Sequence, residues 1–165
     1  MIFISHRGNL NGVISERENS PAYIDECLNS GFRCEIDLRI KGGIPHLGHD
    51  IADYPVSVDW LGKRRDKLWI HVKEYDALIW LMKNIPNSIF FCHESDRYTL
   101  VSNGFIWSHD LTNSMTARCV IPLLSKKSIE NYGQTGAGAV CSDFIYDCIN
   151  KFEPSGESNN DNSII

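Results

Sequence analysis

Short apolar runs recur along this chain of 165 residues, and polar segments rich in turn residues separate them. Runs of this length that are rich in Val, Ile, Phe, Trp and Leu are typical of β-strands. The pattern predicts strands at residues 2–5, 34–40, 68–72, 88–92, 105–108, 119–123 and 139–142.

Helical signals lie between several of these strands. Ser20 is a preferred N-cap residue, Pro21 suits the first helical position, and Gly31 is a common helix terminator. The pattern predicts a helix between them, a second from residue 73 or 74 to residue 84, and a third at about residues 128–133. The apolar stripe of the first helix consists of Ile24, Cys27 and Leu28.

A turn signal follows the second predicted strand. Residues 41–43 read Lys-Gly-Gly, which favours a tight turn between two antiparallel strands. We therefore expect the chain to fold back there as a hairpin and to bring His49 close to Glu35 and Asp37.

The alternation of strands and helices predicts an α/β fold with a largely parallel sheet. A complete (β/α)8 barrel needs about 250 residues, so we expect a trimmed or incomplete TIM-type barrel. Residues 1–152 form the predicted barrel domain. Residues 153–165 are rich in Ser, Asn, Asp and Gly and predict a disordered tail.

Two acidic residues alternate with apolar ones on the second predicted strand. Strand side chains repeat with period two, so Glu35 and Asp37 share one face. Two carboxylates on a buried face repel each other unless a cation lies between them, and a hard divalent ion such as Mg2+ or Ca2+ fits that need. The alternative is an ordinary half-buried strand with a solvated polar face.

Histidines follow the predicted strands with unusual regularity. In a barrel, the strand ends form the C-terminal face where active sites are built. For each histidine taken alone, a structural role is the competing interpretation. Five of the six come at or just after an apolar stretch, namely His6, His49, His71, His93 and His109.

Four ordered motifs give these residues a context. They are His-Arg-Gly at residues 6–8, Glu-Asn-Ser at 18–20, Glu-x-Asp at 35–37 and His-Asp at 49–50. Together they resemble the glycerophosphodiester phosphodiesterase family, whose relatives include the phosphatidylinositol-specific phospholipases C and the sphingomyelinase D toxins. The family pattern has threonine where this chain has Ser20.

The resemblance implies a barrel of the phospholipase C-like phosphodiesterase kind and a role for each matched residue. His6 and His49 would be the catalytic acid and base, and Arg7 would contact the phosphate. Glu35 and Asp37 would be metal ligands. The last predicted strand, within residues 138–144, is similar to the family's last strand and supports the fold more than the site.

A third metal ligand marks a departure from the family. It usually comes from an acidic residue two positions before a lysine on the next core strand. Here the lysine is Lys73, a second candidate phosphate contact, but His71 occupies the acidic position. We expect Mg2+ or Ca2+ as the ion. Imidazole suits Zn2+, Mn2+ or Fe2+ better than Ca2+, so Mn2+ or Zn2+ is an alternative if His71 is a ligand.

The expected function is therefore a metal-dependent phosphodiesterase that acts on a small glycerophosphodiester-like molecule. Two alternatives remain open. A degenerate barrel would bind a phosphorylated or sugar ligand without turnover. A metal-dependent amidohydrolase would also place histidines at barrel strand ends, but that class carries His-x-His on its first strand, where this chain has His-Arg-Gly.

Composition narrows the range of partners. The net charge is −5, and the basic clusters at residues 63–65 and 126–127 are short, which argues against a nucleic-acid partner. No window has the roughly twenty apolar residues of a membrane span, and the apolar start is too short for a signal peptide, so we expect a cytoplasmic protein. The six cysteines lack a Cys-x-x-Cys pair, and the sequence indicates no oligomeric state.

Overall fold

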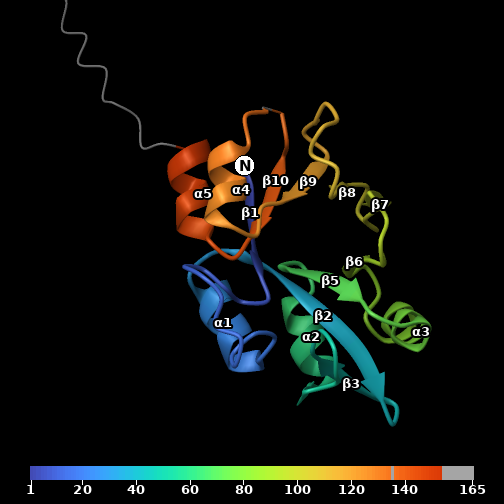
Figure 1. Cartoon of the computed structure of the whole chain (residues 1–165). Helices are drawn as coiled ribbons and strands as arrows, with labels where there is room; N and C mark the ends of the chain where they lie inside the picture. The colour runs from blue at the N-terminus through green and yellow to red at the C-terminus, as the bar shows by residue number, and fades with distance from the viewer. Residues whose placement is uncertain (135, 154–165) are drawn as a thin grey trace, which may run out of the picture.

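A computed structural model describes residues 1–134 and 136–153. It is a mixed α/β fold in which a curled, mainly parallel sheet is flanked by helices (Figure 1). Its strands are β1 (Ile2–His6), β2 (Arg33–Lys41), β3 (Ile44–Leu47), β4 (Tyr54–Pro55), β5 (Leu68–Val72), β6 (Ile89–Phe91), β7 (Tyr98–Leu100), β8 (Ile106–Ser108), β9 (Cys119–Pro122) and β10 (Ala139–Ser142). Its helices are α1 (Pro21–Asn29), α2 (Val58–Arg64), α3 (Tyr75–Asn84), α4 (Lys126–Asn131) and α5 (Ile145–Phe152).

The parallel strands run in the order β6, β5, β2, β1, β10, β9, β8. The predicted hairpin is confirmed, because β3 pairs antiparallel with β2. At the other end β7 pairs antiparallel with β8. Among the described residues β6 and β7 do not pair as strands, so a complete (β/α)8 barrel is not formed.

Ser102 joins the two ends of the curled sheet. Its backbone N–H donates to the Phe90 carbonyl at 2.9 Å, and its Oγ accepts from the Phe90 N–H at 2.9 Å. The Thr99 hydroxyl donates to the Cys92 carbonyl at 3.0 Å. These bonds connect β6 to the β7–β8 hairpin and leave a central interior between the strands.

Alternate side chains of the strands point to opposite faces of the sheet, so the core has two layers, one outside the curl and one inside it. On β2, the outward side chains of Cys34, Ile36 and Leu38 are fully buried beneath the helices. The inward positions of the strands form a separate aromatic core that fills the interior of the curl. Its buried members are Ile4, Trp69, Phe91, Val101, Trp107, Val120, Ala139 and Cys141.

The predicted strands and the three predicted helices are confirmed to within about two residues at their ends. Ser20 caps α1 as expected, with its side chain accepting from the Tyr23 N–H. The third helix was expected at residues 128–133, but α4 begins at Lys126 because Ser125 and Ser128 form a reciprocal capping box.

Helices α2 and α5 were not predicted. The predicted tail at residues 153–165 lies outside the described residues apart from Glu153. Within the part of the chain that is described, no helix combines the length and the apolar character needed to cross a bilayer.

The first prediction concerns Gly138, which precedes β10. A Cβ at Gly138 would lie 2.0 Å from the Ala117 carbonyl oxygen, which is backbone and cannot swing away. We expect Gly138→Ala to lower the free energy of unfolding by about 1–3 kcal/mol, as overpacking does. Urea denaturation measures the change.

The matched control is Gly62→Ala in α2, where a Cβ meets no atom within 4 Å. Alanine is favoured over glycine in a helix, so this variant is expected to gain up to about 1 kcal/mol. Equal stability of the two variants would contradict the close approach of the backbone at Gly138.

Candidate active site and metal centre

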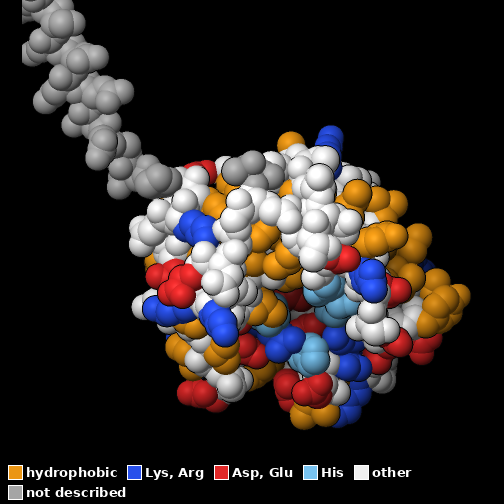
Figure 2. All heavy atoms as spheres, turned by 45° about the horizontal axis from the view of Figure 1, so that its top comes forward, with side chains coloured by type: hydrophobic (Ala, Val, Ile, Leu, Met, Phe, Trp, Pro, Cys, Tyr) orange, Lys and Arg blue, Asp and Glu red, His pale blue; other side chains and the backbone are white. Residues whose placement is uncertain are grey.

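The C-terminal ends of the parallel strands open into one cavity of about 160 Å³. Figure 2 shows histidines gathered there beside acidic and basic side chains, in a hollow on one face of the molecule. Five of the six histidines line it, as the sequence predicted from their positions after strands. The lining residues are His6, Arg7, Glu35, His49, His71, Phe91, His93, Trp107, His109, Pro122, Leu124 and Cys141.

Strand register brings Glu35, Asp37 and His71 together at the base of this cavity. Asp37 and His71 are register partners in the parallel β2–β5 pair, and Glu35 lies two residues earlier on the same face. The Nδ1 atom of His71 lies 3.2 Å from Asp37 Oδ1 and 3.9 Å from Glu35 Oε1. All three side chains are buried, so the predicted shared face of the two carboxylates is an interior one.

Asp37 is the most heavily contacted charge in the site. Arg7 Nε lies 3.0 Å from its Oδ2, and Lys73 Nζ lies 3.6 Å from its Oδ1. Asn19 donates from Nδ2 to Asp37 Oδ2 at 2.9 Å and accepts the Asp37 backbone N–H at the same distance. Burial alone would raise the pKa of Asp37, but the His71 hydrogen bond, the Arg7 charge and Asn19 outweigh it and lower that pKa.

Glu35 has the opposite environment. Burial and the neighbouring Asp37 charge raise its pKa to about 7. Its Oε2 atom is buried and has no hydrogen-bond partner in residues 1–134 and 136–153. An orphaned carboxylate oxygen beside a second carboxylate is the feature that a bound cation would satisfy.

A hydrogen bond on the side of His71 that faces away from the carboxylates shows which ring nitrogen carries a proton. Its Nε2 lies 3.3 Å from the His93 carbonyl oxygen, which can only accept. Nε2 therefore carries a proton, which leaves Nδ1 as the nitrogen that would face a cation bound beside Glu35 and Asp37. Metal-ligating histidines usually have this carbonyl partner on the outer nitrogen. The donor set of two carboxylates and one imidazole fits a divalent cation, and its nitrogen favours Mn2+ or Zn2+ over Ca2+.

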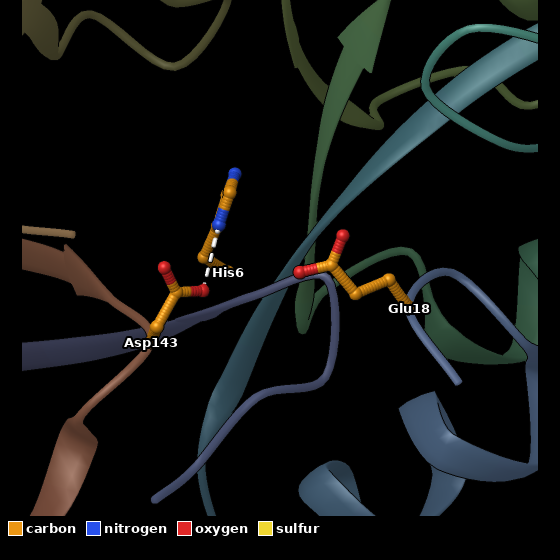
Figure 3. Close-up of side chains that lie close together, drawn as sticks. All are labelled: His6, Glu18 and Asp143. Atoms are coloured by element: carbon orange, nitrogen blue, oxygen red, sulfur yellow. Dashed lines mark hydrogen bonds and ion pairs between the residues drawn. The ribbon is translucent and has the colours of Figure 1, made fainter. Parts of the chain in front are cut away.

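His6 is held by a residue that was not among the predicted site residues. Its Nδ1 bonds Asp143 Oδ1 at 2.8 Å, and Figure 3 shows the other ring nitrogen pointing away from both Asp143 and Glu18. Asn9 ties the two carboxylates together, donating to Asp143 at 2.8 Å and to Glu18 at 2.7 Å. Burial would lower the pKa of His6, but the Asp143 hydrogen bond and the Glu35 charge raise it.

The loop after β1 holds Arg7 in the left-handed region, with φ of 54°. The Arg7 N–H donates to the Glu35 carbonyl, and the Arg7 carbonyl accepts from Asn19, which is itself left-handed with φ of 61°. Such backbone strain persists only where neighbouring contacts fix it. Gly8 is also required, because it has φ of 98° and a Cβ there would lie 2.7 Å from the Tyr23 ring.

His49 lies on the loop after the β2–β3 hairpin, and its side chain is 41% exposed. Arg39 holds the backbone there by donating to the carbonyls of Gly48 and His49. The His49 Nδ1 bonds Asp50 Oδ1 at 2.7 Å. The hairpin thus brings His49 to the cavity that Glu35 lines, as predicted.

Two predicted site residues, Lys73 and Asp37, do not line the cavity. Asp37 lies directly behind it, where Arg7 contacts it. Lys73 lines a neighbouring hollow and reaches Asp37 from there. Sequence reasoning missed Asp143, Asn9 and Asn19. Two signals were available: Asn19 lies in the Glu-Asn-Ser motif, and Asp143 comes directly after the last strand.

The raised pKa of Glu35 generates a prediction about stability. A carboxyl that binds its proton more tightly in the folded state stabilises the fold at low pH, and that contribution is lost as pH rises from 4.5 to about 7. Glu35→Gln resembles the protonated form. We compare the free energy of unfolding of this variant with that of the wild type in EDTA. We expect the difference, variant minus wild type, to be about 1–3 kcal/mol larger at pH 8 than at pH 5.

Urea denaturation at the two pH values measures this difference. The control is Glu130→Gln, which removes an exposed carboxylate from α4 and is expected to change stability equally at both pH values. A Glu35→Gln difference that is the same at pH 5 and pH 8 would mean that Glu35 is not a buried proton-binding group.

Comparisons with protein-family models, with curated proteins and with solved structures found no match. The resemblance in the four sequence motifs therefore remains a prediction. The assignment of the site depends on the geometry of its own residues.

Proposed function

We propose that this chain is a metal-dependent phosphodiesterase that acts on a small glycerophosphodiester-like substrate by acid–base chemistry of His6 and His49. The observation that carries the proposal is the convergence of residues far apart in the sequence on one cavity. A histidine backed by Asp143, a second histidine, a guanidinium and the Glu35 carboxylate all line it, with Asp37 directly behind. These are the groups that hydrolysis of a phosphodiester requires.

The fold is consistent with this proposal as a trimmed TIM-type barrel of the phospholipase C-like kind. Seven strands are parallel, aromatic side chains fill the interior, and the cavity lies at the carboxyl ends of the strands. Barrel enzymes build their active sites at that end. The loops after β6 and β8 contain no helix among the described residues, which is the trimming that the chain length predicted.

Glu35, Asp37 and His71 would hold the divalent cation. Mg2+ or Ca2+ would use the carboxylate oxygens, and Mn2+ or Zn2+ would use His71 as well. When bound, the cation supplies positive charge to a non-bridging phosphate oxygen.

Arg7 is placed to bind the same phosphate. Its Nε and Nη1 atoms are fixed by Asp37 and Glu18, at 3.0 Å and 3.2 Å, so the guanidinium is oriented before a substrate arrives. A planar guanidinium recognises phosphate through parallel hydrogen bonds. Lys73 adds positive charge from behind Asp37.

Two proton transfers complete the reaction. Because Asp143 occupies Nδ1 of His6, Nε2 is the nitrogen that exchanges a proton with the substrate. One histidine takes the proton of the attacking hydroxyl or water, and the other protonates the leaving alkoxide, which departs poorly as an anion. Attack by a hydroxyl of the substrate itself would give a cyclic phosphate, and attack by water would give the open monoester.

One observation favours a second candidate function, ligand binding without turnover. Asp37 already contacts Arg7 and Lys73, so two cationic side chains of the protein balance its charge. A site neutralised in this way could bind a phosphorylated ligand through Arg7 and release it unchanged. Thermal stabilisation by the ligand with no product would be its signature.

The test is hydrolysis of a panel of glycerophosphodiesters with Mg2+, Ca2+, Mn2+ or Zn2+, against EDTA, with products identified by mass. We expect metal-dependent release of an alcohol. His6→Ala and His49→Ala should each lower kcat by roughly 100-fold or more, since general acid–base catalysis contributes that much.

The matched control is His46→Ala. This histidine lies on β3, bonds the Ile44 carbonyl and does not line the cavity, so its variant should keep wild-type activity. Near-normal turnover in both His6→Ala and His49→Ala would overturn the catalytic assignment. Stabilisation by a glycerophosphodiester without turnover would favour the binding function instead.

A further inference from the structure

A second group of nitrogen donors lines the cavity, and the proposed phosphodiester chemistry does not use it. His93 follows β6 and His109 follows β8, and their Nε2 atoms lie 3.2 Å apart. The ring centroids are 4.5 Å apart and the ring planes meet at 51°. The two imidazoles thus bring the same ring nitrogen within hydrogen-bond distance of each other.

The separation of these nitrogens matches the requirement of a metal ion. Zinc binds histidine nitrogen at 2.0–2.1 Å, and two such ligands of a tetrahedral ion lie roughly 3.3 Å apart. The observed 3.2 Å is close to this separation. A hydrogen bond from the Nε2–H of one neutral imidazole to the Nε2 of the other also suits this distance. A metal would bind once that proton moves to Nδ1 of the same ring, which frees both Nε2 lone pairs.

Packing restrains the orientation of His93. Its ring stacks on His71 with parallel planes and centroids 4.6 Å apart. Phe91, two residues earlier at the end of β6, also stacks on His71. His109 is exposed, so an ion can reach the pair from solvent. A preorganised ligand next to an open approach is a suitable arrangement for a site that exchanges its ion.

We propose that His93 and His109 form a second metal site for a borderline transition ion such as Zn2+, separate from the Glu35, Asp37 and His71 group. Two imidazoles select Zn2+, Ni2+ or Cu2+ and do not attract Mg2+ or Ca2+. With two ligands from the protein, the remaining coordination positions are open to water or to an anionic oxygen of a molecule in the cavity. The site does not depend on the phosphodiesterase proposal.

The surroundings of His93 Nδ1, the nitrogen that would not bind the ion, predict how tightly the ion binds. Metal-ligating histidines usually donate that N–H to a carbonyl or carboxylate, and loss of this partner weakens metal affinity by about 10- to 100-fold. The His93 Nδ1 atom is buried and has no hydrogen-bond partner within the described ranges. We therefore expect an ion that EDTA removes readily.

The experiment measures metal binding and not activity. The full chain is stripped with EDTA and titrated with Zn2+ by calorimetry and with Co2+ by visible absorption, since Co2+ reports nitrogen coordination directly. We expect one equivalent that depends on His93 and His109. His109→Ala and His93→Ala should weaken that equivalent by more than roughly 10-fold, and excess Mg2+ should not displace it.

Two further variants separate this site from its neighbours. His46→Ala is the matched histidine control and should bind both ions as the wild type does. Glu35→Gln alters the acidic group and should leave the His93- and His109-dependent Co2+ spectrum in place. Unchanged Zn2+ and Co2+ binding in His109→Ala and His93→Ala would overturn the proposal, as would loss of all Co2+ binding in Glu35→Gln.

Discussion

The burial of two carboxylates on one inward face of β2 is the constraint on which the rest of the site depends. Asp37 is fully buried, and four side chains from two segments contact it. Arg7 and Asn19 come from the loop between β1 and α1, and His71 and Lys73 come from β5 and its end. These contacts lower its pKa and keep it ionised. Removing one partner would leave a buried charge incompletely compensated. The left-handed backbone of Arg7 and Asn19 is held by the same contacts, so strain and charge balance support each other here.

Strand periodicity explains why polar chemistry and an aromatic core coexist in one small interior. Trp69 and His71 face inward from β5, and Phe91 and His93 face inward at and beyond β6, in each case two residues apart. The aromatic member lies deeper in the curl and the histidine lies at the strand end. Each strand thus contributes an apolar side chain to the core and an imidazole to the cavity. Flat rings stack from strand to strand along the wall, which restrains the histidines without the use of their nitrogens.

Sequence patterns predicted the features whose causes are local. β5 and β10 carry continuous apolar runs and were placed correctly at both ends, and the Ser20 cap fixed the start of α1. Helix α5 was not predicted although Ile145, Cys148, Ile149 and Phe152 have helical spacing, and no side-chain N-cap marks its start. The contact of Asp143 with His6 is not local, because it depends on the parallel pairing of β1 with β10 across most of the chain. The role of Asn19 is not local either, because its amide contacts Asp37 on β2, 18 residues further along the chain.

The charge balance around the cavity is the physical argument for the proposed cation. Four carboxylates, those of Glu18, Glu35, Asp37 and Asp143, meet two permanent cations, Arg7 and Lys73. With neutral histidines this leaves a surplus of negative charge, which an anionic phosphate would enlarge. The protein reduces the surplus by raising the pKa of Glu35 and of His6, so that each retains a proton more readily. A divalent ion among Glu35, Asp37 and His71 would balance the same charge without those protons. His6 would then be free to exchange its proton with a substrate.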